Sequence, residues 1–399
     1  MADTGRAKPG WKRVKFGDVV RLSKARSQEP LKDGFERYVG LEHLEPGDLR
    51  IRSWGNVADG VTFTSVFRPG QVLFGKRRAY QRKVAVADFA GVCSGDIYVL
   101  ETADAQVLLP ELLPFICQTE TFFDHAVGSS AGSLSPRTNW ASLASYEFLL
   151  PPLEEQRRHL DALSAMLHTA AQLVDLARIA ELARMSQLLH SFRRKRGSCD
   201  HFPKEWAIRT VRDCGNVQVG IRKHPGSLSG SNMRPYLRVA NVLDDEITWD
   251  EVMSIHVPDP DIIRCALKEG DILVNKGNSI NLVGRASIFR KSAHMEGEVF
   301  FQDHLMRFRP NEDVDSEYAL GYFQHLLYTS QFTRIAGAST SIATIPLAAF
   351  EGLPFPVPPI GEQVEIGRTL RGLADACNCA RKRLAATRSM MRSLMEEWA

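Results

Sequence analysis

The chain repeats itself after about 200 residues, and this duplication limits what it can fold into. The segment Gly70-Gln-Val-Leu-Phe-Gly-Lys76 matches Gly270-Asp-Ile-Leu-Val-Asn-Lys276 at an offset of 200. Further on, two more pairs match at an offset of 207: Ser94-Gly-Asp96 with Phe301-Gln-Asp303, and Leu150-Pro-Pro-Leu-Glu-Glu-Gln156 with Val357-Pro-Pro-Ile-Gly-Glu-Gln363. Solenoid repeats are only about 20–50 residues long. The longer period therefore predicts two whole domains of one kind.

Each half divides into a globular part and a long helix. Alternating apolar residues at 37–44 and 235–242 predict strands, whereas residues 108–125 and 316–335 have helical patterns. This mixture is typical of an α+β fold. Pro151-Pro152 and Pro358-Pro359 suit the start of a helix. We therefore expect globular domains at 11–150 and 203–357, followed by helices at 151–197 and 358–399.

After each Pro-Pro pair, apolar residues recur at steps of three and four, as in a coiled-coil seam. The first seam comprises Leu160, Leu163, Leu167, Ala170, Val174 and Ala177, and Glu181 and Arg184 then interrupt it. The second comprises Leu370, Leu373, Cys377, Ala380, Leu384, Thr387, Met391, Leu394 and Trp398. Two helices of about 40 residues, each roughly 60 Å long, are expected to pair antiparallel with pseudo-twofold symmetry. The alternative is that each helix packs only on its own domain.

Basic residues are clustered although the net charge is only +3. Residues 76–83 carry five positive charges around Tyr80, and Lys-Gly-Asn-Ser-Ile stands at the matching place in the second half. Lys and Arg bind phosphates, while Arg, Asn and Ser also bind base edges. A solvated loop is the alternative. The candidate DNA-binding residues are Lys76, Arg77, Arg78, Tyr80, Arg82, Lys83, Arg222, Lys223, Arg234, Lys276, Asn278, Ser279, Asn281 and Arg285.

No catalytic or metal-binding motif is recognisable. Gly70 to Lys76 is close to a P-loop, but Arg77 replaces the hydroxyl residue that would hold Mg²⁺. The seven cysteines are scattered, which argues against disulfides and structural zinc. Asp244, Asp245 and Glu246 are interpreted as a solvated turn rather than as metal ligands. No segment is apolar enough to span a membrane, and a cytoplasmic protein is expected.

The duplicated Pro-Pro-x-x-Glu-Gln blocks, each before a long helix, resemble the specificity subunit of Type I restriction–modification enzymes. The stretch from Gly70 to Val84, Cys93-Ser-Gly-Asp96 and Gly337-Ala-Ser-Thr340 is similar to that family's target-recognition domains. The first half departs from this pattern, since it has Ala131-Gly-Ser-Leu134 where the second half has Ala338-Ser-Thr-Ser341. The resemblance therefore predicts the local turn less well in the first domain. The resemblance implies that each domain recognises half of a bipartite DNA site and that the helices set the spacing between the half-sites.

The resemblance also implies partners. DNA adenine methyltransferase subunits would dock on the helices, and an ATP-dependent restriction subunit would join them. S-adenosylmethionine, ATP and Mg would then bind to those partners, and this chain would hold no cofactor. The Pro-Pro-x-x-Glu-Gln blocks and the helical seams, which match in the two halves, would serve a shared partner and the spacer. The loops after Lys76 and Lys276, which differ, would bind two different half-sites. The alternatives are a DNA-acting enzyme with an unrecognised site and a coiled-coil scaffold that binds only protein.

Overall fold

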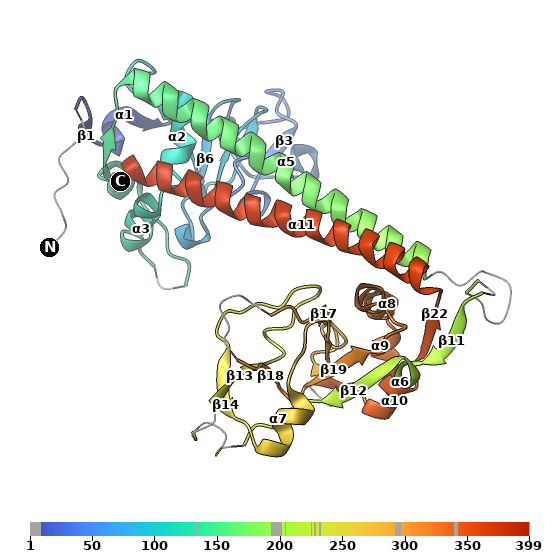
Figure 1. Cartoon of the computed structure of the whole chain (residues 1–399). Coiled ribbons are helices and arrows are strands. Elements are labelled where there is room, and N and C mark those ends of the chain that lie inside the picture. Colours follow the sequence, from blue (N-terminus) through green and yellow to red (C-terminus); the bar gives the residue numbers. More distant parts are fainter. Residues whose placement is uncertain are drawn as a thin grey trace. The chain divides into compact units, whose positions relative to one another are not determined.

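The computed structural model describes residues 9–132, 134–192, 202–203, 205–224, 226, 229–230, 233–291, 297–338 and 342–398. The chain forms two compact units. Unit 1 comprises Met1–Leu173 with Lys382–Ala399, and unit 2 comprises Val174–Arg381. Each unit therefore contains one globular domain and one segment of each long helix (Figure 1). The boundaries predicted from the sequence keep each helix whole, whereas the two units each take a segment of both helices. The domain boundaries remain a prediction.

The globular part of unit 1 contains two four-stranded sheets and a two-stranded ribbon. The first sheet has the antiparallel order β2 (Val20–Leu22), β9 (Ile97–Thr102), β6 (Val72–Gly75) and β7 (Val84–Val86). The second has the order β4 (Gly55–Asn56), β3 (Arg37–Val39), β8 (Gly91–Cys93) and β5 (Ser65–Phe67), with β3 and β8 parallel. The ribbon pairs β1 (Lys12–Lys15) with β10 (Glu147–Leu150). The short helices are α1 (Phe16–Val19), α2 (Leu113–Ile116), α3 (Glu120–Gly128) and α4 (Trp140–Ala144).

Unit 2 repeats this topology. Its antiparallel sheet has the order β12 (Gly215–Val219), β19 (Leu305–Pro310), β15 (Ile272–Asn275) and β17 (Ala286–Ile288). A second sheet contains β14 (Met253–His256), β13 (Met233–Leu237) and β18 (Phe300–Phe301), with β13 and β18 parallel. A ribbon pairs β11 (Ala207–Thr210) with β22 (Pro354–Val357). A small sheet contains β16 (Gly277–Asn278), β21 (Ala343–Thr344) and β20 (Gly337–Ala338). The helices are α6 (Val211–Cys214), α7 (Asp259–Cys265), α8 (Ser316–Tyr328), α9 (Gln331–Ile335) and α10 (Leu347–Glu351).

Strand register confirms the duplication and corrects one match. Gly75 pairs with Ile97 in unit 1, and Asn275 pairs with Leu305 in unit 2, so the offset along these strands is 208. Asp96 therefore corresponds to His304, and the predicted match with Asp303 is wrong by one residue. The prediction matched the two aspartates, Asp96 and Asp303, by residue type. The backbone pairing of the strand that follows each of them gives the correct register.

The long helices α5 (Leu153–Ser191) and α11 (Ile360–Met395) lie side by side within each unit (Figure 1). In unit 2, Cys377 Sγ lies 3.6 Å from the carbonyl oxygen of Ala177, and Leu188 and Leu370 both lie against Gly321 of α8. In unit 1, Trp398 Nε1 donates to His159 Nδ1 at 3.1 Å. Later residues of α5 thus meet earlier residues of α11. The helices are antiparallel, and the alternative that each packs only on its own domain is wrong.

The helix–helix seam differs from its prediction at two positions. Leu167 and Val174 are exposed, whereas Leu163 is buried and Met166 and Leu173 are half-buried. The interface in unit 2 buries small residues, namely Ala177, Ala180, Ala374 and Ala380. Small side chains allow close approach of the helices, and Ala177 and Ala380 confirm predicted seam positions. Only at Leu167 and Val174 is the preceding residue, Met166 or Leu173, the more buried one. The remaining predicted positions are buried or half-buried, namely Leu160, Leu370, Leu373, Leu384, Met391 and Leu394.

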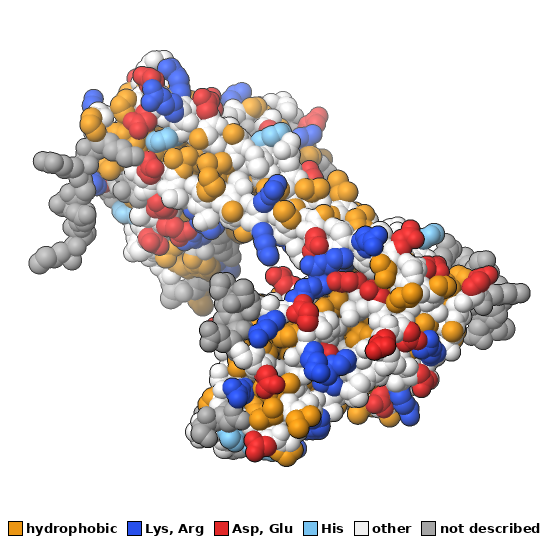
Figure 2. Space-filling model, viewed as in Figure 1, with side chains coloured by type: hydrophobic (Ala, Val, Ile, Leu, Met, Phe, Trp, Pro, Cys, Tyr) orange, Lys and Arg blue, Asp and Glu red, His pale blue; other side chains and the backbone are white. Residues whose placement is uncertain are grey.

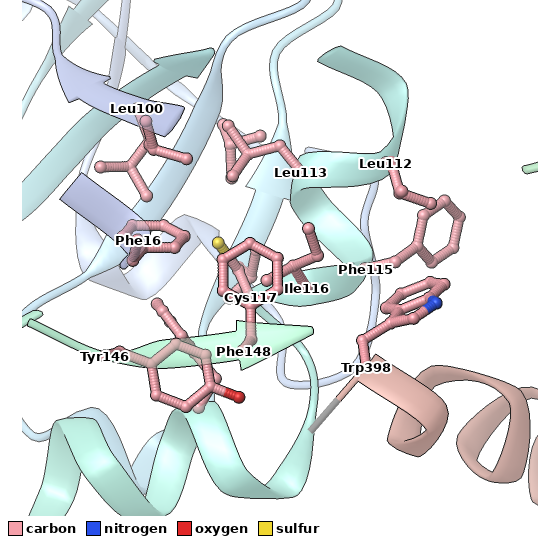
Figure 3. Packing of buried hydrophobic residues seen from close by; sticks show 14 of the residues in the cluster. Phe16, Leu100, Leu112, Leu113, Phe115, Ile116, Cys117, Tyr146, Phe148 and Trp398 are labelled. Carbon is pink, nitrogen blue, oxygen red and sulfur yellow. The ribbon is translucent and has the colours of Figure 1, made fainter. Parts of the chain in front are cut away.

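The core of unit 1 includes the end of α11 and the 3₁₀ turn Glu396–Trp398 that directly follows it. Trp398 is buried among residues of the globular domain and lies next to Phe115 and Ile116 (Figure 3). The Glu396 side chain accepts a hydrogen bond of 2.8 Å from the backbone N–H of Glu120, at the start of α3. The end of α11 is therefore part of the hydrophobic core of the first domain. No helix in the described ranges is long and apolar enough to cross a membrane.

The glutamines of the two Pro-Pro-x-x-Glu-Gln blocks anchor the helix starts. Gln156 Nε2 donates to the carbonyl oxygens of Val107 and Pro151, and its Oε1 accepts from Leu109 N. Gln363 makes the same three bonds, to Asp313, Pro358 and Asp315. Both side chains are buried. A buried amide with all three bonds satisfied fixes the angle at which each helix leaves its domain.

Candidate nucleic-acid interface

Two loops that differ in sequence occupy equivalent places in the two units. The backbone N–H of Lys76 donates to Asp96 O, and its carbonyl accepts from Thr138 N. Lys276 is bound in the same way by His304 O and Ile345 N. We call residues 76–83 the first loop and residues 276–285 the second loop. Each is held between the start of a long strand and the segment before a short helix.

The segment beside each loop also repeats. In unit 2 it forms the sheet β16-β21-β20, in which Gly277 faces Thr344. In unit 1 the same places carry only the isolated bridges of Arg77 and Ala131 with Arg137. The blocks at 131–134 and 337–340 thus lie next to the loops, although residues 133, 339 and 340 fall outside the described residues.

An acidic residue organises the arginines of the first loop. Asp96 accepts from Arg137 Nε at 2.8 Å and from Arg77 Nη1 at 3.3 Å. Partial burial alone would raise the pKa of Asp96, but the hydrogen bonds and charges of Arg137 and Arg77 outweigh it and lower the pKa. Arg77 also donates to Ser135 Oγ at 3.1 Å. Two guanidinium groups are therefore fixed in place, with one excess positive charge between them.

Several basic residues of the first loop have partners within the unit. Arg82 forms a bidentate ion pair with Glu120 and lies over the ring of Phe123. Lys83 Nζ donates to Leu41 O at 2.7 Å. These side chains would have to give up intramolecular bonds in order to contact a phosphate.

Arg78 and Tyr80 are better placed to contact a ligand, because the bond that Arg78 Nη2 donates to Ser135 Oγ is long, at 3.4 Å, and has an uncharged acceptor. Arg78 and Arg82 both have φ of 55°, a left-handed conformation that is uncommon for side chains of this size. They flank the single turn Ala79–Gln81, and Tyr80 on that turn is 55% exposed. Lys76 Nζ lies 4.6 Å from the centre of the Tyr98 ring. The strained backbone thus presents an aromatic ring among basic groups.

The second loop has a different chemistry at the same place. Ser279 and Asn281 are exposed, and Lys276, Asn278 and Arg285 are half-buried. A side chain at Gly277 would meet His304 Nδ1 at 2.7 Å, so this glycine permits close packing of the loop on His304, directly before β19. Amide and hydroxyl groups therefore dominate where the first loop presents charges.

The other candidates lie elsewhere in unit 2. Arg222 and Lys223 are exposed beyond β12, an edge strand that is two strands from β15. Arg234 is half-buried in β13, which belongs to another sheet. The basic run at 193–196 lies outside the described residues. Ile221 accepts a hydrogen bond from the backbone N–H of Asp303, beside His304, so Arg222 and Lys223 follow at the same end of the sheet as Lys276, whereas Arg234 lies in another sheet.

The turn at residues 243–246 is not fully solvated, and that interpretation is wrong for Asp245. Its side chain is buried, and Oδ1 lies 3.6 Å from Arg184 Nη2 of α5. Burial raises the pKa of Asp245, and the charges of Arg184 and Arg371 only partly offset this effect. No group of three or more His, Cys, Asp or Glu in the described part of the chain could hold a metal ion. Sequence reasoning missed the Arg184–Asp245 pair, for which the interrupted helix seam was the only signal.

Comparison with known proteins assigns a family to both halves. A family model described as "Type I restriction modification DNA specificity domain" matches residues 9–184 and again residues 203–385. The EcoDI specificity subunit of a type I restriction enzyme from Escherichia coli is 30% identical over 194 residues, which are 45% of this chain and 40% of that protein. The matched part thus spans less than half of that relative.

Two solved structures have the same fold over nearly the whole chain. The S subunit of a type I restriction–modification system from M. genitalium has a TM-score of 0.63 at 13% identity and covers 99% of this chain and 97% of its own. A chain from a study of complex assembly and conformational transition of the type I R-M system has a TM-score of 0.55 at 18% identity, with 98% of both chains covered. Since both identities are low, these likenesses establish the fold alone.

Proposed function

This chain belongs to the family of type I restriction–modification DNA specificity domains, and we propose that it selects the DNA sequence on which a type I complex acts. Each globular domain recognises one half of a bipartite, asymmetric site in double-stranded DNA. The chain contributes recognition rather than catalysis. Methylation with S-adenosylmethionine, and the steps that need ATP and Mg, belong to partner subunits in the cytoplasm.

One observation carries this proposal: the same backbone frame holds two loops of different chemistry. Lys76 and Lys276 have equivalent backbone partners, yet Arg77, Arg78 and Tyr80 follow the first and Asn278 and Ser279 follow the second. Arginine pairs well with guanine, and asparagine pairs well with adenine. Two such loops suit two half-sites that differ in sequence.

The paired helices suit the role of a spacer. The helix α5 has 39 residues and α11 has 36, and each contributes a segment to both units. A continuous helix keeps a fixed rise per residue. We therefore assign to the helices the distance between the half-sites.

The outer face of α5 is a candidate docking surface for a DNA adenine methyltransferase subunit. Leu176, Ile179 and Leu182 are all at least half exposed on the part of α5 that belongs to unit 2. Figure 2 shows hydrophobic side chains along this helix. Exposed aliphatic residues at helical spacing are typical of a face that another protein covers. A restriction subunit would join through the methyltransferase complex.

Binding of the chain, co-purified with its methyltransferase partner, to a pool of randomised duplexes tests the proposal. We expect enrichment of one bipartite motif, with affinity that falls steeply as salt rises because phosphates are bound. The isolated chain should transfer no labelled methyl group to DNA. Equal binding to all duplexes at physiological salt would refute the proposal.

A further inference from the structure

A buried ion pair joins α5 to the second domain. The side chains of Arg184 and Asp245 are only 13% and 6% exposed, and Arg184 Nη2 lies 3.6 Å from Asp245 Oδ1. Gln324 Nε2 lies 3.4 Å from the same Oδ1 and 3.3 Å from Asp244 Oδ1. Tyr328 donates its hydroxyl hydrogen to Asp244. The end of α5 is thus connected to the turn at 243–246 through a polar cluster.

That turn is also connected to both ends of the second loop. The backbone N–H of Asp245 donates to Ala286 O at 3.0 Å, directly after the loop. Asn275 Nδ2 donates to Val242 O at 3.3 Å, directly before the loop. Arg184, Asp245, Asn281 and Arg285 line one cavity of about 490 Å³. A single contact of α5 therefore bears on the position of the whole loop.

Among the described residues of unit 1, the positions that correspond to Arg184 and Asp245 form no such ion pair. At the helical offset of 207, Arg184 corresponds to Met391, which is buried in the apolar core of unit 1. Tyr38 and Tyr236 occupy the same register, and this offset of 198 pairs Asp245 with Gly47. Both residues have positive φ, 76° for Gly47 and 65° for Asp245. Both halves of the ion pair are therefore replaced together by residues without charge.

Stability alone does not account for this difference. Burying two charges costs desolvation energy, and apolar residues of similar size often serve as well or better. A carboxylate at positive φ adds backbone strain that Gly47 avoids. Buried ion pairs are better known for fixing one arrangement among several similar ones. This chain has two homologous domains and two similar helix ends, so more than one pairing of domain with helix end competes.

We propose that Arg184 and Asp245 form a positioning contact, specific to unit 2, that fixes the second domain on α5 and so orients the second loop for base recognition. The part that concerns bases rests on the proposed function. The part that concerns loop position does not, and it can be measured without DNA.

Hydrogen exchange of the full-length chain tests the loop position. The variants are Arg184→Met, and Arg184→Met with Asp245→Asn, which removes both charges and keeps a residue that tolerates positive φ. Arg381→Met is the matched control, since Arg381 forms an exposed pair with Glu181 across the same two helices. We expect exchange in residues 276–289 to rise about tenfold in both test variants, as for loss of a local restraint. Residues 76–86 and the control should not change.

The neutral double variant separates positioning from simple charge compensation. We expect it to regain the melting temperature that Arg184→Met loses, while its second loop still exchanges fast. If it regains loop protection as well, or if neither variant exposes the loop, the proposal is overturned. Should Arg184→Met fail to fold, the double variant alone decides.

Selection from randomised duplexes with the methyltransferase complex tests the consequence for DNA. The double variant should lose enrichment of bases in one half-site and retain the other. Equal loss in both half-sites, or in neither, would overturn the inference. A wild-type complex that enriches no motif would refute the proposed function, while the exchange experiment still decides the loop contact.

Discussion

The indole Nε1 of Trp11 donates a hydrogen bond to Glu155 Oε2 at 2.8 Å, and Trp206 repeats this bond with Glu362 Oε2 at 3.1 Å. The first residues of each domain are thereby bound to the first turn of the following helix. Together with Gln156 and Gln363, these bonds use the polar side chains of the Pro-Pro-x-x-Glu-Gln blocks inside each unit. The blocks therefore hold domain and helix together, and a partner would have to bind elsewhere on the helices.

Replacing Gln156 by Ala should destabilise unit 1 by about 2–4 kcal/mol, because three backbone groups would lose their hydrogen bonds to this buried amide. Hydrogen exchange resolved by segment is the appropriate measurement, since a two-domain chain need not unfold in one step. Protection should fall in residues 107–156 and stay unchanged in unit 2. Glu154→Ala is the control, because Glu154 is exposed and its ion pair with Arg158 contributes little.

Trp398→Ala should destabilise unit 1 by about 3–5 kcal/mol, the usual cost of removing a large buried aromatic side chain. The expected loss of protection includes α2 and α3, against which the end of α11 packs. Met390→Ala at an exposed position of the same helix should change stability by less than about 0.5 kcal/mol. Similar effects of the two substitutions would show that the end of α11 is not part of the core.

Arg78→Ala should weaken binding to the cognate duplex by about 1–3 kcal/mol if this residue contacts a base. Arg82→Ala is the comparison, because Glu120 already neutralises Arg82. Its effect on binding should be several times smaller. Fluorescence anisotropy with the selected duplex measures both, and an equal loss would mean that the Glu120 pair opens on binding.

The acid dependence of unit 1 should include Asp96. Its folded pKa lies below the ordinary value of 3.8, so the carboxylate stabilises the fold above that pH, and the contribution is lost as the pH falls through the folded pKa. The melting temperature of wild type should therefore exceed that of Asp96→Asn at neutral pH, and the difference should shrink below pH 3.8. A constant difference over pH 3–7 would contradict this account of the Arg77 and Arg137 contacts.

Ile179→Glu should weaken assembly with the methyltransferase by at least about tenfold, because a charge would be buried in the interface. Met390→Glu is the matched control, an equally exposed apolar residue on the other helix. Analytical ultracentrifugation of the co-expressed subunits distinguishes them. If Ile179→Glu assembles as wild type does, the partner binds another face.

Local sequence patterns predicted much of this molecule. The Pro-Pro pairs mark the helix starts, and Lys76 and Lys276 directly follow equivalent strands, because these features depend on neighbouring residues. Two things could not be predicted in this way. Leu167 and Val174 are exposed although the predicted seam includes them, and Ala180 and Ala374 are buried although it does not, since close approach depends on both helices at once. Asp245 is buried beside Arg184, although the two residues are 61 positions apart along the chain.

The most direct test of the central claim is to sequence the methylated adenines of a cell that expresses this chain with its methyltransferase, as wild type and as Asn281→Ala. The account predicts one bipartite asymmetric motif for wild type, and relaxed bases in only one half of it for the variant. A continuous motif, methylation that does not depend on this chain, or a variant that alters both halves equally would contradict the claim that two domains recognise two half-sites.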